Sequence, residues 1–180
     1  MRKGRFLTLR ETVLFGLFPA VMMGTQLAMS ALPNIHLTGV LIVVLTRLFR
    51  AKALFPIYVY VFLMGLYLGF SLWWIPYLYV WITLWGMTML IPRKIPDRLA
   101  RVLLPAVCSL HGFIYGSLWA LSQPFLTGLS WEGVPGYILS GLLFDVYHGL
   151  GNLCLGTLIF PLCKAISGLH EYKFVRTRKE

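Results

Sequence analysis

The sequence predicts an all-α integral membrane protein, a single six-helix bundle with both termini in the cytoplasm. The chain of 180 residues is 58% hydrophobic and only 12% charged, and its mean hydropathy of +0.77 lies far outside the balance of a soluble domain. Its apolar runs reach the roughly 20 residues that cross a bilayer. Its basic residues are confined to four stretches of the chain, which indicates a fixed orientation in the membrane.

Six apolar segments follow one another, separated by Pro, Gly and charged residues. They predict spans at residues 11–31, 36–50, 53–71, 74–91, 99–122 and 134–163. The second span is short, and it is only weakly separated from the third. Because the connectors are short, residues 1–180 are expected to form one transmembrane domain, with no room for a separate soluble domain. The first apolar run is of full span length and further spans follow it, so it is interpreted as a span and not as a signal peptide.

All Lys and Arg residues lie in the N-terminal tail, between the second and third spans, between the fourth and fifth, or at the C-terminal end. The other three connectors, around ALPNIH, SLWWIPY and LSQPFLTGLSWEGVPG, contain none. Because basic connectors stay in the cytoplasm, this partition places both termini inside and requires an even number of spans. The net charge of +10 therefore follows from topology, and no nucleic-acid partner is expected.

The first span carries small residues at every fourth position, within GLFPAVMMGTQLA. They are Gly16, Ala20, Gly24 and Ala28. A stripe of this kind lets another helix approach closely. It is compatible with packing inside the bundle and with contact to a second protein.

The fourth span begins with a dense group of aromatic residues, in WWIPYLYVW. Rings often gather at the membrane interface as a belt. Here Trp73, Tyr77 and Trp81 share one helical face, whereas Trp74 and Tyr79 point elsewhere. Some of these rings are therefore expected to face inward, where they would stack on a planar or amphipathic ligand.

The sixth span contains three polar residues, in LLFDVYHGLGN. Asp145, His148 and Asn152 are spaced i, i+3 and i+7, which places them on one side of a helix near the middle of the membrane. An ionisable group at that depth is a candidate functional residue. His111 of the fifth span lies at a similar depth, with Tyr115 one turn further out, so a pair between Asp145 and either His111 or His148 is expected to satisfy the charge.

Three alternatives for this polar face remain open. It could be an interhelical hydrogen-bond network with no ligand. It could belong to a small intramembrane enzyme acting on a lipid-linked substrate, with Asp145 and His148 or His111 as acid and base. It could also serve a stand-alone ion- or proton-coupled carrier, although the chain lacks the two comparable halves of an inverted repeat. No nucleophile elbow, HExxH motif, acidic metal cluster or phosphate loop is present, and the three cysteines lack metal-ligand spacing. No catalytic residue, metal or cofactor is therefore expected.

The succession of the small-residue first span, LPNIHLTGVLIVVLTRLF, KALFPIYVYVFLMGLYLGFSLWWIPYLYVW and GLLFDVYHGLGN resembles the S-components of energy-coupling-factor (ECF) transporters. The resemblance covers about residues 10–165. It implies a non-catalytic, six-helix substrate-binding subunit of an ABC importer in the prokaryotic cytoplasmic membrane. It also implies a vitamin-like substrate and docking to a membrane coupling subunit with two ATPase subunits. No Walker motif occurs in the chain, so ATP hydrolysis is expected only in those partners.

The resemblance also implies roles for particular residues. The AxxxA-type pattern by which such proteins contact the coupling subunit corresponds to Ala20, Gly24 and Ala28, which continue the stripe from Gly16. The residues implied to bind substrate are Asn34, His36, Trp74, Tyr77, Trp81, His111, Tyr115, Asp145, His148 and Asn152. The absence of Lys and Arg from the outer connectors favours a bulky or planar, weakly charged vitamin over a strongly anionic one.

Overall fold

The structure, a computed structural model, describes the backbone of residues 7–32 and 34–176, and the side chains of these residues up to residue 167. This part of the chain is helical and contains no strand, which confirms the all-α class. In order, the helices are α1 (Leu9–Ala28), α2 (Thr38–Phe49), the 3-10 turn η1 (Arg50–Ala53), α3 (Leu54–Leu68), α4 (Trp74–Met89), α5 (Asp97–Ala120), α6 (Gln123–Thr127), the 3-10 turn η2 (Trp131–Gly133), α7 (Val134–Gly156) and α8 (Ile159–Arg176).

Three helical segments of the described chain are long and apolar enough to cross a membrane: Leu9–Ala28, Asp97–Thr127 and Trp131–Gly156. The helices in the positions of the second, third and fourth predicted spans are shorter, with 12, 15 and 16 residues. At 1.5 Å per residue, α2 is about 18 Å long, against a hydrocarbon core of roughly 30 Å. The length expected of a span is therefore shown for three of the six predicted segments.

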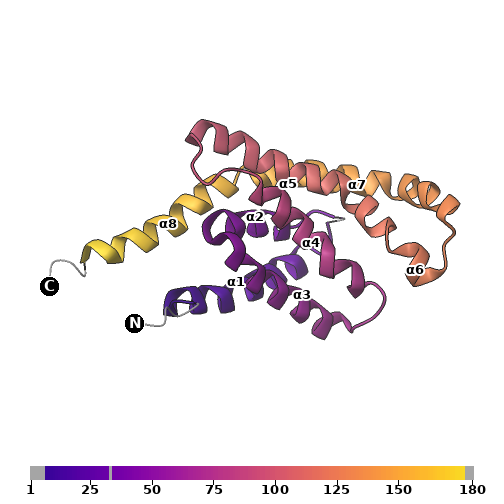
Figure 1. Cartoon of the computed structure of the whole chain (residues 1–180), viewed down its shortest axis with the longest axis horizontal. Helices are drawn as coiled ribbons and strands as arrows, with labels where there is room; N and C mark the ends of the chain where they lie inside the picture. The colour runs from indigo at the N-terminus through magenta and orange to yellow at the C-terminus, as the bar shows by residue number, and fades with distance from the viewer. Residues whose placement is uncertain (1–6, 33, 177–180) are drawn as a thin grey trace.

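The shortest of these helices, α2, lies at the centre of the bundle. Apart from Arg47 near its end, its sequence TGVLIVVLTRLF is uncharged with apolar residues on every side, as is typical of a helix that other helices surround. All nine residues from 38 to 46 are buried, and α2 contacts α1, α4, α5, α7 and α8. In Figure 1 it lies among the other helices of the bundle. The β-branched residues Val40, Ile42, Val43 and Val44 are completely inaccessible to solvent.

The two longest helices, α5 and α7, run side by side in opposite directions (Figure 1). Small residues let their backbones come very close. A Cβ atom added to Gly112 would lie 2.8 Å from the backbone N and Cα of Gly149, and one added to Gly156 would lie 2.9 Å from the Cα of Pro105. The Ser109 hydroxyl donates a 2.9 Å hydrogen bond to the Gly149 carbonyl. This is the close approach that glycine permits in membrane helices.

The predicted sixth segment, residues 134–163, is not one continuous helix. α7 ends at Gly156 and α8 begins at Ile159. Pro161 has no N–H with which to continue the helical ladder to the carbonyl of residue 157, and Thr157 instead bonds back to the Cys154 carbonyl through both its N–H and its hydroxyl. Figure 1 shows α8 leaving the line of α7 at an angle, toward the end where α1 begins.

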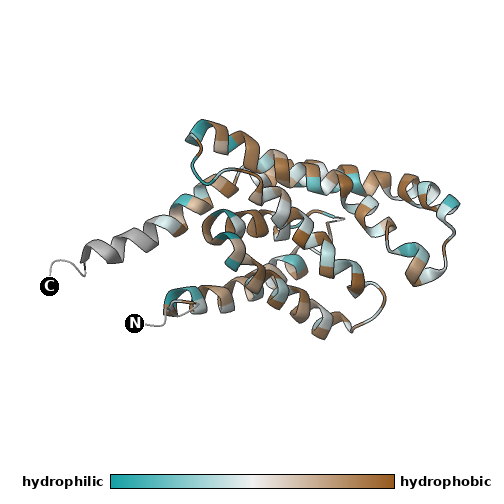
Figure 2. Cartoon of the chain, in the orientation of Figure 1, coloured by the Kyte–Doolittle hydropathy of each residue, from teal (hydrophilic) through white to brown (hydrophobic). Residues whose placement is uncertain are grey.

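Within the described residues, parts of the chain that belong to the four basic stretches lie at one end of the bundle. Lys52 pairs with Glu11 of the first turn of α1 at 2.8 Å, and Arg47, Arg93 and Lys164 line one cavity. The beginning of α1 and the end of α8 lie at this end, whereas α6 lies at the opposite end (Figure 1). Figure 2 shows hydrophobic residues along the length of the helices. The bundle is therefore apolar along its sides and polar at its ends.

Candidate ligand-binding site

Five residues form a largely buried group, here called the histidine cluster: His36, Trp81, His111, Tyr115 and His148. Four of them are buried and Tyr115 is partly exposed. The ring of His148 lies 4.7 Å from that of Tyr115, 4.9 Å from that of His36 and 6.3 Å from that of His111, measured between centroids. Trp81 closes the group, 5.6 Å from Tyr115 and 5.8 Å from His111. All five were nominated from the sequence, and the structure brings them together.

The five members come from four parts of the fold. His36 lies in the turn before α2, Trp81 in the middle of α4, His111 and Tyr115 one turn apart on α5, and His148 on α7. The four regions meet because α2 is short and central, so the turn that precedes it enters the bundle beside α4, α5 and α7. Tyr77, also nominated from the sequence, adds a ring 5.6 Å from Trp81.

Two further aromatic residues belong to this region and were not predicted. Tyr60 of α3 is fully buried with its ring 6.3 Å from that of Trp81, and Trp119 lies 6.2 Å from both Tyr77 and Tyr115. In α3 the segment LFPIYVYVFLMGLYL is apolar on all sides, so periodicity does not separate the buried Tyr60 from its exposed neighbours. Trp119 is four residues after Tyr115, a spacing that places both residues on one helical face. Trp119 could therefore have been predicted from the sequence.

Several polar atoms in and beside the cluster have no hydrogen-bond partner in the described part of the chain. These are His36 Nδ1, His111 Nδ1, both ring nitrogens of His148, Trp81 Nε1, Tyr60 Oη and Trp119 Nε1. The second ring nitrogen of His111 is 2.8 Å from the Val80 carbonyl, to which it donates. Buried polar atoms are nearly always paired, and each unpaired one costs about 1–3 kcal/mol. The cluster therefore brings several unpaired hydrogen-bonding groups together in one region of the bundle.

The centre of the cluster is closed, whereas Tyr115 at its margin is partly exposed. His111 and His148 are 0% exposed and Trp81 is 1% exposed, so no space large enough for a water molecule adjoins these side chains. A ligand can reach the unpaired nitrogens only if a neighbouring element moves. Of the elements that supply the cluster, the turn carrying His36 is the one that belongs to no helix, because it connects α1 to α2.

Asn34 attaches that turn to α7. Its backbone has a φ of 55°, the left-handed conformation that asparagine adopts more readily than most residues. Its side-chain amide donates a 3.3 Å hydrogen bond to the Phe144 carbonyl. Ile35 of the same turn also lies against α7, where a Cβ atom added to Gly151 would be 3.1 Å from Ile35 Cγ1. The turn is therefore attached to α7 by one weak hydrogen bond and by apolar packing.

Trp74 is not part of the cluster. Its indole N–H donates to the Val61 carbonyl at 2.9 Å, and its ring packs edge-on against Phe70 at 5.0 Å. It therefore fixes the corner between α3 and α4. Of the aromatic residues nominated on α4, the structure joins Tyr77 and Trp81 to the histidines and leaves Trp74 outside.

Asp145 does not pair with a histidine, and that expectation was wrong. Its carboxylate accepts a 2.8 Å hydrogen bond from the backbone N–H of Gly116, and within the described residues the carboxylate forms no ion pair with His111 or His148. Gly116 has no side chain to cover its N–H, so the carboxylate approaches the α5 backbone directly. The arrangement also gives no support to an acid–base pair of the kind that the intramembrane-enzyme alternative requires.

Asn152 likewise joins α7 to α5. Its amide N–H donates to the Cys108 carbonyl at 3.1 Å, although its carbonyl oxygen has no partner among the described residues. Asp145 and Asn152 thus hold two helices together, as in the ligand-free packing network considered above, while His148 faces the cluster. The polar residues of α7 divide between two roles.

The small-residue stripe of α1 faces away from the rest of the described chain. Gly16, Ala20, Gly24 and Ala28 are all exposed, and a Cβ atom added to Gly16 or Gly24 would have no other heavy atom within 4 Å. The buried face of α1 consists instead of Phe15, Phe18, Pro19 and Met22. Of the two alternatives left open by the sequence, packing of the stripe inside the bundle does not occur.

No group of three or more His, Cys, Asp or Glu side chains in the described residues is arranged to hold a metal ion. Comparison of the chain with protein-family models, with curated proteins and with solved structures finds no match.

Proposed function

We propose that this protein is the substrate-binding subunit of an ECF-type vitamin importer, as the sequence resemblance implies. The observation that carries the proposal is the histidine cluster, where rings from four regions of the fold surround polar atoms without partners. A ligand with several hydrogen-bonding groups and a flat apolar body would pair these atoms and stack on the rings. The substrate class follows from this surface: a neutral or weakly charged heterocyclic vitamin.

In the proposed arrangement, α1 to α5 and α7 cross the prokaryotic cytoplasmic membrane. The short helices α2, α3 and α4 need not cover the full hydrocarbon thickness, because α1, α5 and α7 are longer and contact them. The basic end of the bundle is then cytoplasmic and the end with α6 is external. This orientation agrees with the common position of the beginning of α1 and the end of α8 (Figure 1).

The external turn that carries His36 acts as the gate of the site. Substrate entry displaces this turn and breaks the weak bond of Asn34 to α7, and the turn closes again over the bound molecule. His148, with both ring nitrogens unpaired, provides one donor and one acceptor if it is neutral. Asp145 and Asn152 support the site by holding α7 against α5, and do not themselves contact substrate.

The outward stripe of α1 supports the second half of the proposal, docking to a membrane coupling subunit. Contact with lipid tails does not require small residues, because a leucine-rich helix packs equally well against lipid. Small residues are needed only where the backbone of a partner helix comes close. Gly16, Ala20, Gly24 and Ala28 form that surface, and the coupling subunit with its two ATPase subunits supplies the energy. Reorientation of the loaded bundle is taken from the family resemblance.

The proposal is tested by melting the detergent-purified protein in the presence of each water-soluble vitamin. A ligand at 100 times its dissociation constant stabilises the folded state by about 2.7 kcal/mol, a rise in melting temperature of about 5–10 °C for a chain of this size. His148→Leu should abolish the rise, whereas Tyr147→Leu, the exposed neighbour on the same helix, should retain it. A folded protein that no vitamin stabilises would contradict the proposal.

A further inference from the structure

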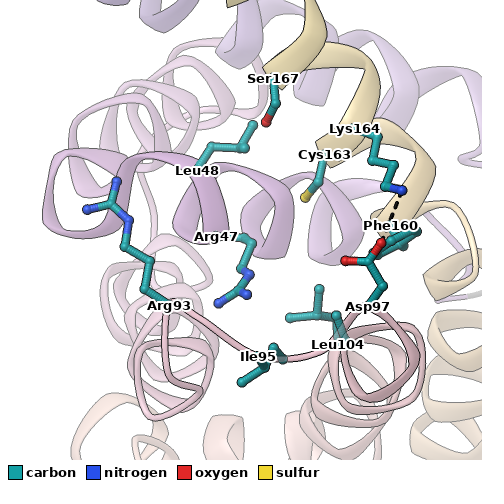
Figure 3. A pocket seen from close by; sticks show the side chains of 11 residues that line it. Arg47, Leu48, Arg93, Ile95, Asp97, Leu104, Phe160, Cys163, Lys164 and Ser167 are labelled. Carbon is teal, nitrogen blue, oxygen red and sulfur yellow. Dashed lines mark ion pairs between the residues drawn. The ribbon is translucent and has the colours of Figure 1, made fainter. Parts of the chain in front are cut away.

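A cavity of about 590 Å³ opens at the basic end of the bundle, away from the histidine cluster. It lies between the end of α2, the connector from α4 to α5, and the first turns of α8 (Figure 3). Three cations line it, Arg47, Arg93 and Lys164, against one carboxylate, that of Asp97. The cavity wall therefore has a net charge of +2.

Arg47 is the fixed element of this cavity. It belongs to the last turn of α2, is only partly exposed, and donates a 2.6 Å hydrogen bond from Nη1 to the Pro92 carbonyl. No carboxylate of the described residues lies within ion-pair distance of it. Figure 3 shows its guanidinium directed into the cavity. A guanidinium has five N–H donors in a rigid fork, so donors remain available for an anion.

The other charged residues are placed around this group. Arg93 lines the cavity from the α4–α5 connector, with its exposed side chain along one side of the cavity (Figure 3), and it forms no ion pair within the described residues. Lys164 pairs with Asp97 at 3.1 Å, and both side chains are largely exposed, so this pair is worth little and can rearrange. The Lys164 ammonium lies over the ring of Phe160, 4.9 Å from its centroid. Phe160 also provides an apolar wall of the cavity.

We propose that this cavity binds a phosphate group, presented by an anionic phospholipid headgroup or by a soluble phosphate ester. Arginine forks match phosphate oxygens and form short, charge-assisted hydrogen bonds with them. The proposal goes beyond vitamin binding, because it uses different residues at the other end of the bundle. Under the orientation proposed above, the cavity lies at the level of the inner-leaflet headgroups, where anionic lipids are attracted to basic residues.

The test measures retention of phosphatidylglycerol and of phosphatidylcholine on the detergent-purified full chain by native mass spectrometry. Competition with glycerol 3-phosphate is measured in parallel. The double variant Arg47→Gln with Arg93→Gln should weaken binding by at least about tenfold, since each charge-assisted hydrogen bond lost contributes on that scale. Arg98→Gln is the matched control, because Arg98 is exposed on the neighbouring first turn of α5 and does not line the cavity.

Two results support the site and identify its ligand. Preferential retention of phosphatidylglycerol that glycerol 3-phosphate does not displace assigns the site to a lipid headgroup, and binding of glycerol 3-phosphate itself assigns it to a soluble ester. Equal retention of both lipids without phosphate ester binding overturns the proposal, as does an equal loss in Arg98→Gln. Arg93→Gln alone removes no described hydrogen bond and should weaken phosphate binding in part. It keeps the test valid if the double variant does not fold. Vitamin-induced stabilisation is a separate measurement, so failure of one proposal leaves the other intact.

Discussion

Adding one methyl group at the crossing of α5 and α7 should destabilise the protein measurably. In Gly112→Ala the new Cβ would lie 2.8 Å from the N and Cα of Gly149 and from the carbonyl carbon of His148. These are backbone atoms, so no side chain can rotate away, and the helices must separate by about 0.6 Å to restore ordinary contact at 3.4 Å. Overpacking of this kind costs about 1–3 kcal/mol.

Replacement of glycine by alanine inside a helix also stabilises the folded state by about 0.5–1 kcal/mol. The net loss expected for Gly112→Ala is therefore roughly 1–2 kcal/mol, a fall in melting temperature of about 2–8 °C. Gly24→Ala is the matched control, because its added Cβ has no other heavy atom within 4 Å. Gly24→Ala gains the stabilisation of alanine over glycine in a helix without any overpacking. It should therefore melt at the same temperature as the parent protein or slightly above it.

The assay is thermal unfolding of both variants in the same detergent, followed by intrinsic tryptophan fluorescence. Equal melting temperatures for Gly112→Ala and Gly24→Ala would refute the close crossing of α5 and α7. Because Gly112 and Gly149 directly follow His111 and His148 in the sequence, separation of the helices should also widen the distance between the two histidines. Gly112→Ala should therefore reduce vitamin affinity as well as stability.

Three further predictions test the other contacts. Asn152→Leu removes the bond to the Cys108 carbonyl and should lower stability by about 1–2 kcal/mol in the same melting assay; an unchanged melting temperature would show that this bond is not formed. Glu11→Gln breaks the ion pair with Lys52 at the partly exposed start of α1 and should cost less than about 1 kcal/mol, so a larger loss would contradict its surface position. Gly24→Leu should leave vitamin-induced stabilisation intact but abolish uptake by cells that carry the coupling subunits; retained uptake would exclude the stripe as the docking surface.

The sequence predicted the helical class and the order of the helices because hydrophobic segment length and punctuation are local properties. It did not locate the break after Gly156, although Pro161 was visible, since a proline inside a long apolar run is compatible with either a kink or an end. It also did not identify α2 as the central helix. Burial on all sides depends on which neighbours surround a helix, and an apolar helix facing lipid has the same composition as one facing protein.

The candidate site was predicted in part, for the same reason. His36, Trp81, His111, Tyr115 and His148 were nominated because polar or aromatic groups in apolar segments are conspicuous. Tyr60 was missed because it lies in a helix that is apolar throughout. The predicted charge pairing of Asp145 failed because the sequence does not show that the backbone N–H of a glycine on the facing helix is available to a carboxylate.

The division of roles along α7 follows from helix geometry. At about 100° per residue, Asp145, Gly149, Asn152 and Gly156 lie within about 60° of one another, and this narrow strip faces α5. His148 lies to one side of this strip, about 40–100° from its members. On α5 the residues that meet the strip, from Pro105 to Gly116, are likewise flanked on one side by His111 and Tyr115.

On both helices the flanking residues are offset from the contact strip in the same rotational direction about the helix axis. Because the two helices are antiparallel, these offsets place the residues on the same side of the interface. His148, His111 and Tyr115 therefore converge in one groove beside the glycine contacts, where His36 and Trp81 cover them. Close packing of the glycines brings the flanking rings within 6.3 Å of one another. The same contact that holds α5 against α7 thus positions the polar groups proposed to bind substrate, so variants of the strip should alter stability and affinity together.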